Sequence, residues 1–178
     1  MIDSGGVGTR TPTFVKGTDM PTPELLDANK EHCLVLVKPD GFKRGLTGEV
    51  LRRIEARGYV LKGLKIKFAT KELLADHYEE HVERHFYPSL EAYMMSGPVV
   101  AAVVEGDRVV EGVRTMVGAT NPTLAAAGTI RGDLGRDWGG DNVENVVHAS
   151  DSPTSAIREI ALWFPELDYH EDAKTDAK

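Results

Sequence analysis

The sequence has little cysteine, no long hydrophobic run and no export signal. Its single cysteine, Cys33, cannot form an internal disulfide or a two-cysteine zinc site, and it lies in the apolar run CLVLV, where a buried, inert thiol is expected. No apolar run approaches the ~20 residues of a membrane span. The amino terminus has neither the basic start nor the apolar stretch of a secretory signal. These absences predict a soluble, cytoplasmic protein that does not span a membrane.

The chain also lacks an excess of basic residues. With 21 Lys and Arg against 28 Asp and Glu, its formal net charge is −7. A general nucleic-acid binder needs many Lys and Arg contacts to phosphates, so specific nucleic-acid binding is not expected. A local basic pocket is compatible with this charge, because Lys38, Arg84, Arg114 and Arg131 are scattered along the chain and could converge in a folded cleft.

The length of 178 residues is that of one ordinary domain. Residues 1–23 are rich in Gly, Thr and Pro and lack an apolar period, which predicts a flexible extension. Met20 precedes the globular part, so residues 1–19 could be a leader or a misassigned start, and we expect them to be dispensable. Residues 24–169 form the predicted domain, and residues 170–178 a polar tail.

Periodicity indicates alternating strands and helices. The apolar run 33–37 predicts a strand ending at a Lys-Pro-Asp-Gly turn, and Thr47 and Gly58 are the expected N-cap and stop of a helix. Residues 59–69 alternate as a half-buried strand. Residues 71–95 have helical periods broken at Pro88. The near-continuous apolar run within 98–105 is typical of a central strand.

The second half continues the pattern. Residues 108–117 are helical, and residues 118–140 form a long Gly-, Asn- and Pro-rich connection, which we interpret as a binding loop. Val146 and Val147 supply a last strand, and Ser152 with the following proline begins a helix that runs to about residue 164. This order predicts an α+β fold, a ferredoxin-like split βαβ sandwich in which helices cover one face of an antiparallel sheet.

Five segments, in order and spacing, carry a resemblance to one family: VKPDGFKRGLTGEVLRRIEARG, SGPVVAAVVEG, VRTMVGATNP, GTIRGD and NVVHASDS. They closely resemble the signature segments of nucleoside diphosphate kinases, over about residues 32–169. The resemblance implies a ferredoxin-like fold, magnesium-bound nucleoside di- and triphosphates as substrates, a ping-pong reaction of broad base specificity, and a homo-oligomer, with a hexamer preferred over a tetramer.

The chemistry of the residues agrees with that family. Phosphoryl transfer needs charge-neutralising donors and a positioned nucleophile, and a neutral imidazole is a competent nucleophile near pH 7. His148 follows a β-branched run and precedes a helix start, at an expected strand end. By resemblance His148 carries the phosphoryl group, and Glu159 in the following helix orients its ring.

The resemblance also implies a nucleotide site. Lys38, Arg84, Arg114, Thr120, Arg131 and Asn145 correspond to phosphate- and ribose-contacting groups, Phe86 to the aromatic that stacks on the base, with Tyr78 and Leu90 nearby, and Asp151 to a carboxylate that meets Mg²⁺ through water. One departure is an insertion within 134–144. The base of the nucleotide would be held between two side chains, of which Phe86 is one. Because of the insertion, the second is not assigned among Trp138, Asn142 and Val143.

Two other classes of function compete with this interpretation. His77, His81 and the intervening Glu80 fit the HxxEH pattern of inverted zinc peptidases, with His85 one turn further, but a catalytic zinc needs a third protein ligand and the run EEHVERH has the polarity of a solvated helix face. The third class is a binding protein that kept the fold and lost the activity. Against it, each residue assigned to catalysis is present in the expected order.

Overall fold

The computed structural model describes residues 26–27, 29–137, 139, 144–167 and 169–170. Their elements run in the order β1 (Leu26–Asp27), β2 (His32–Val37), α1 (Pro39–Lys43), α2 (Thr47–Ala56), β3 (Val60–Lys67), α3 (Lys71–His77), the 3₁₀ turn η1 (Glu79–His81), α4 (Tyr87–Met94), β4 (Val99–Glu105), α5 (Val109–Val117), η2 (Pro122–Leu124), α6 (Ile130–Leu134), β5 (Val147–Ala149), α7 (Pro153–Trp163) and β6 (Tyr169–His170). The predicted extension 1–23 and residues 171–178 of the predicted tail lie outside the described residues.

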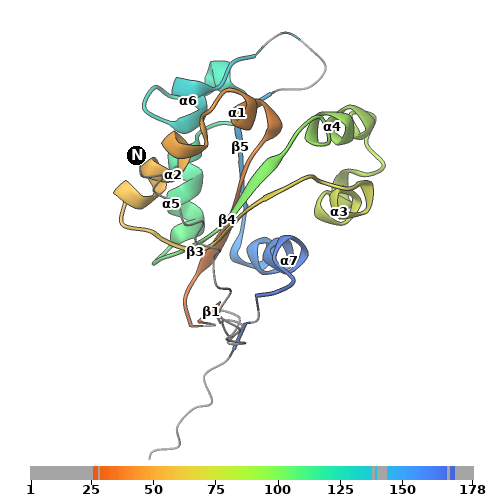
Figure 1. Cartoon of the computed structure of the whole chain (residues 1–178). Coiled ribbons are helices and arrows are strands. Elements are labelled where there is room, and N and C mark those ends of the chain that lie inside the picture. The colour runs from red at the N-terminus through yellow and green to blue at the C-terminus, as the bar shows by residue number, and fades with distance from the viewer. Residues whose placement is uncertain (1–25, 28, 138, 140–143, 168, 171–178) are drawn as a thin grey trace, which may run out of the picture.

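A four-stranded antiparallel sheet forms the centre, in the order β3-β4-β2-β5 (Figure 1). This order places the first and third long strands side by side in the middle, as the split βαβ arrangement requires. The α+β, ferredoxin-like fold is therefore confirmed. The short strands β1 and β6, which the sequence did not indicate, pair in parallel as a separate ribbon.

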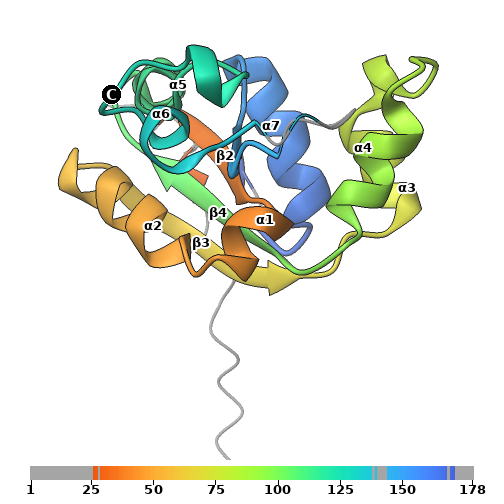
Figure 2. The ribbon, with the colours of Figure 1, turned by 90° about the horizontal axis from the view of Figure 1, so that it is seen from above.

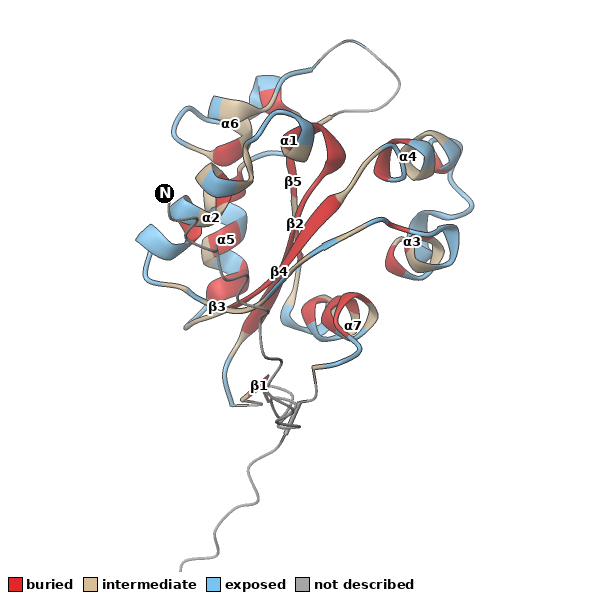
Figure 3. Ribbon diagram, viewed as in Figure 1, coloured by how far each residue is buried: buried red, intermediate tan, exposed pale blue. Residues whose placement is uncertain are grey.

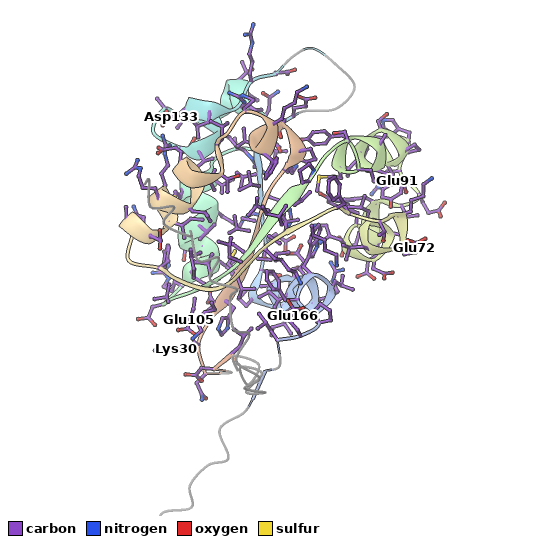
Figure 4. All side chains as sticks on the ribbon, viewed as in Figure 1. Lys30, Glu72, Glu91, Glu105, Asp133 and Glu166 are labelled. Atoms are coloured by element: carbon purple, nitrogen blue, oxygen red, sulfur yellow. The ribbon has the colours of Figure 1, made fainter. Side chains whose placement is uncertain are left out.

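Helices cover both faces of the sheet, and the expectation of one covered face is wrong. Helices α2 and α5 lie on one side and α3, α4 and α7 on the other (Figures 1 and 2). Every residue of β2, and all of β4 except its last, is buried, which requires cover on both faces (Figure 3). Side chains fill the space between the sheet and each helical layer (Figure 4).

Three predicted boundaries move by a few residues. Leu46 occupies the N-cap of α2 and Thr47 is its first residue. Pro88 lies in the first turn of α4, where its fixed φ is favourable, so the break falls between His81 and Tyr87. The strand predicted at Val146 and Val147 is β5, Val147–Ala149, so His148 lies within it rather than after it.

Other sequence signals agree with the structure. Gly58 has φ +87° just past α2, the left-handed conformation that ends a helix. Ser152 caps α7, its Oγ accepting from the Ser155 N–H at 3.1 Å. The predicted loop 118–140 contains η2 and α6, capped by Asn121 and Thr129. Within the described part of the chain, no helix has the length and apolar character needed to cross a membrane.

Candidate active site

A cavity of about 620 Å³ opens among the end of β2, the α3–α4 hairpin, the end of α5, the loop after it, α6, β5 and α7. It is lined by all but one of the residues that the resemblance singles out: Lys38, Tyr78, Phe86, Leu90, Arg114, Thr120, Arg131, Asn145, His148, Asp151 and Glu159. Arg84 is exposed between η1 and α4 and is not among the lining residues. Segments far apart in sequence thus converge on one polar cavity.

His148 is held from behind by an acidic group on α7. Its Nε2 lies 3.1 Å from Oε1 of Glu159, which is buried. The other carboxylate oxygen of Glu159 accepts from Ser150 Oγ at 2.6 Å, and Ser150 Oγ accepts from the Leu34 N–H of β2 at 3.0 Å. This chain fixes the glutamate to the sheet, and the glutamate fixes the imidazole ring.

His77 is a second histidine beside His148. Their ring centroids lie 4.7 Å apart in an edge-to-face arrangement, and Trp163 donates its indole N–H to His77 Nδ1 at 3.3 Å. Burial, followed by the charges of His148, Arg158 and Lys38, lowers the pKa of His77 to about 2, so the ring is neutral.

The position of His77 removes the basis for the HxxEH interpretation. Helix α3 ends at His77, and His81 lies in the separate turn η1, so the two histidines do not share a face of one helix. His77 is buried, whereas His81 and His85 are exposed. His77 and His81 therefore do not form the pair of zinc ligands that an inverted zinc peptidase has.

A strained turn precedes His148. Val146 has φ +69°, which is rare for a β-branched residue, and the Val147 N–H donates to the Asn145 carbonyl at 2.7 Å across it. Asp40, buried in α1, accepts from the Val146 N–H at 3.1 Å and from the Tyr93 hydroxyl at 2.5 Å. No local pattern distinguishes Asp40 or Tyr93, because their pairing depends on the folded chain.

Gly41 allows this close approach. A side chain on Gly41 would meet the Val146 carbonyl at 2.9 Å, and the Lys38 N–H donates to the same carbonyl at 2.8 Å. The Lys-Pro-Asp-Gly segment, predicted only to end a strand, therefore also holds the turn that leads into the strand of His148.

Two cations, the buried Lys38 and the half-buried Arg131, line the cavity wall. Lys38 donates to Asn145 Oδ1 at 2.8 Å, and Asn145 donates through Nδ2 to the Thr120 carbonyl at 2.9 Å. Burial, then the charge of Arg131, lowers the pKa of Lys38 to about 8. Arg131 is anchored by the carbonyls of Gly118 and Val147 at 3.1 and 2.8 Å, and burial, then Arg114, lowers its pKa to about 10. Like charges held together in a partly buried wall favour an anionic ligand.

The α3–α4 hairpin forms the opposite wall. Phe86 lies against the His81 ring, with centroids 5.7 Å apart, and burial raises the pKa of Tyr78 well above its usual range. Arg158 of α7 donates to the Asp76 carbonyl at 2.7 Å, near the end of α3, and so ties the hairpin to the body of the protein. The sequence analysis missed Arg158, which has no distinguishing local pattern.

Asp151 is an exposed carboxylate at the cavity, three residues after His148 and between β5 and α7. Hydrogen bonds from Ser155, then Ser152, and the charge of Arg114 lower its pKa. Of the insertion within 134–144, residues 138 and 140–143 lie outside the described residues. The open choice between Trp138, Asn142 and Val143 for the second wall of a base clamp falls there.

Comparison with known proteins agrees with this arrangement. The chain is 53% identical over 136 residues to the nucleoside diphosphate kinase of Archaeoglobus fulgidus, covering 76% of this chain and 87% of the relative. It is 53% identical to the cytosolic nucleoside diphosphate kinase of Dictyostelium discoideum, over 76% of this chain and 85% of the relative. Among solved structures, it is similar to the Borrelia burgdorferi nucleoside-diphosphate kinase with bound vanadate and ADP, a transition-state mimic, with a TM-score of 0.72 and 36% identity over 81% of this chain and 94% of that one.

The sheet, the cationic cavity and these relatives define a nucleotide-binding phosphotransferase. The family model of nucleoside diphosphate kinase matches residues 31–169, and the chain belongs to that family. The zinc-peptidase alternative is thereby wrong at the level of the protein class as well.

Proposed function

We propose that this kinase transfers the γ-phosphoryl group reversibly between nucleotides by a ping-pong mechanism through phosphohistidine on His148. The observation that supports this proposal most directly is the 3.1 Å contact of His148 Nε2 with Glu159. It lies in a cavity that is also lined by Lys38, Arg114 and Arg131. A direct transfer needs two nucleotides bound at once, whereas a histidine relay lets one cavity serve donor and acceptor in turn.

The hydrogen bond to Glu159 selects the reacting nitrogen. A carboxylate accepts, so Nε2 of His148 is the donor, and a neutral imidazole then has its free lone pair on Nδ1. Nδ1 attacks the γ-phosphorus, the bond to the β-phosphate oxygen breaks, and the nucleoside diphosphate leaves. Glu159 stabilises the positive charge that the ring gains, and the second nucleotide reverses the sequence.

The remaining lining residues would bind the nucleotide. Arg114 and Arg131 suit the phosphates because guanidinium groups make charge-assisted, often bidentate contacts, and Lys38 adds a point charge. Thr120 offers a hydroxyl, and Asn145 an amide near the ribose and terminal phosphate. Arg84, which is exposed between η1 and α4 and does not line the cavity, would add positive charge from outside it.

Magnesium would arrive with the nucleotide. Of the carboxylates that line the cavity, Asp151 and Glu80 are exposed, whereas Glu159 is engaged by His148 and Ser150. Asp151, three residues after His148, is the one proposed to meet the ion through water. This donor set fits an ion that keeps most of its waters and binds mainly phosphate oxygens. Held there, Mg²⁺ would neutralise part of the phosphate charge.

Incubation with γ-labelled ATP alone tests the phosphohistidine. We expect label to stay with the protein in a bond that is stable to alkali and lost in acid, and to pass to any added nucleoside diphosphate. Double-reciprocal plots should be parallel. Intersecting plots without a labelled protein would overturn the relay.

Base recognition is proposed to rest on stacking against Phe86. Its ring lines the cavity beside Leu90 and Tyr78, and stacking tolerates any base because each has a π-face. Phe86→Ala should weaken binding of purine and pyrimidine nucleotides alike, by roughly 1–3 kcal/mol, in equilibrium titrations. Met95→Ala, at an exposed apolar residue outside the cavity, is the control. A loss confined to one base would show that the site recognises base identity.

We also propose a homo-oligomer, with a hexamer preferred. Strand β3 is a sheet edge. Leu64 and Ile66 on this strand, and Phe68 directly after it, are exposed. Exposed apolar edge strands are sites of association. A second apolar residue, Leu124, is exposed on the turn η2. An assembly larger than a dimer needs a second interface, and Leu124 offers an apolar contact for it. The Dictyostelium relative is cytosolic, and we propose the same compartment here.

Ile66→Lys tests the edge contact, because it would place a charge in a desolvated interface. We expect analytical ultracentrifugation to show smaller species for this variant than for the wild type. Ile157→Lys, at an exposed isoleucine on α7, is the matched control and should sediment as the wild type does. Unchanged sedimentation of Ile66→Lys would exclude β3 from the assembly.

A further inference from the structure

His77, His148 and Glu159 form a cluster of metal-ligand type, in which His77 has no role in the proposed phosphoryl transfer. One donor atom from each lies within 4.8 Å of the other two, and all three residues line the cavity. Two imidazoles and one carboxylate make up a donor set found in catalytic zinc sites, where a water occupies the fourth position. Mg²⁺, which prefers oxygen ligands in octahedral geometry, does not suit this set.

The spacing is close to that of a bound zinc ion. Glu159 Oε1 lies 3.1 Å from His148 Nε2 and 3.9 Å from His77 Nδ1. Two ligands about 2.0–2.1 Å from a tetrahedral zinc lie about 3.4 Å apart, between these two separations. Small side-chain shifts therefore complete the site, and the cavity supplies the open fourth position to water.

His77 has ring nitrogens to offer. Its Nε2 is buried without a hydrogen-bond partner among the described residues, a costly state for a polar atom. Its Nδ1 accepts a 3.3 Å hydrogen bond from Trp163, which a metal ion would replace. A half-turn of the ring would bring the unpartnered Nε2 to the Glu159 side.

We propose that these three residues bind Zn²⁺ and that the bound ion switches off phosphorylation of His148. The inhibition rests on the phosphohistidine mechanism proposed above; the binding site does not. When Nε2 of His148 gives its lone pair to zinc, the single proton of the neutral ring must move to Nδ1 through solvent. Nδ1 then has no lone pair for phosphorus. No proton is lost, and no oxidation occurs.

The binding test uses the full chain without nucleotide, titrated with ZnCl₂ in a calorimeter. We expect one site in the wild type, and about tenfold or greater loss of affinity in His77→Gln, whose amide oxygen can still accept from Trp163. His81→Gln is the matched control, since His81 lines the same cavity outside the cluster, and should bind zinc as the wild type does. Equal affinity in all three proteins, or a loss in His81→Gln alone, would overturn the site.

The inhibition test measures labelling of the protein by γ-labelled ATP in excess Mg²⁺, with and without zinc. The labelling of each variant in zinc is compared with the labelling of the same variant without zinc. Zinc should suppress labelling in the wild type and in His81→Gln, a chelator should restore it, and His77→Gln should need about tenfold more zinc. Equal suppression in His77→Gln would show that zinc acts through the nucleotide and overturn the proposal. Absence of labelling without zinc would contradict the phosphohistidine instead, while a calorimetric loss in His77→Gln would still establish the site.

Discussion

Replacing His148 by Ala should abolish labelling by ATP and turnover together, while nucleotide binding survives. The imidazole is the only group proposed to form a bond with phosphorus, so its removal should lower kcat on the order of 10⁴-fold or more. Two of the proposed phosphate-binding groups do not depend on it for their anchoring: Lys38 is held by Asn145, and Arg131 by two backbone carbonyls.

Equilibrium binding of a nucleoside diphosphate, measured beside kcat, separates the two effects. His81→Ala is the control, because His81 is a histidine of the same cavity without a contact to Glu159 among the described residues. It should keep the label. Undiminished turnover with intersecting double-reciprocal lines in His148→Ala would place the reaction on another group and remove the relay.

Much of the sheet could be predicted because its strands carry local patterns. Strand β3 alternates, and β2 and β4 are continuous apolar runs. Those two runs also indicate that helices cover both faces of the sheet, because a strand with one solvated face alternates between apolar and polar residues. The prediction of one covered face followed the order of elements and gave too little weight to this pattern.

The candidate site could be predicted only in part, for a related reason. Lys38, Asn145 and His148 are near strand ends, where backbone topology alone brings groups together, and their family resemblance named them. His77 is buried and is placed by a tertiary contact with Trp163, whereas its neighbours in the sequence have the polarity of a solvated helix face and give no sign of that burial. Val146 has a conformation that its residue type disfavours, and a buried carboxylate far away in sequence stabilises it.

That carboxylate belongs to Asp40, and Asp40→Ala should impair both stability and turnover. The change leaves two buried donors, the Val146 N–H and the Tyr93 hydroxyl, without their acceptor, at about 1–3 kcal/mol each in the free energy of unfolding. Val146 would then relax from φ +69°, and Asn145 and His148 on either side would shift. A displacement of about 1 Å at a reacting group can cost roughly 10²-fold in rate, so we expect kcat to fall by about that factor.

Two variants separate the turn from the rest of this network. Asp40→Asn keeps an oxygen that can accept from Val146, so it should retain most of the turnover. Tyr93→Phe removes the hydroxyl and leaves the contact of Asp40 with the turn intact, so it should lose stability with little loss of kcat. Denaturant unfolding and kcat, measured for all three proteins, give the comparison. If Tyr93→Phe lost as much turnover as Asp40→Ala, the hydroxyl contact rather than the turn at Val146 would be what positions His148.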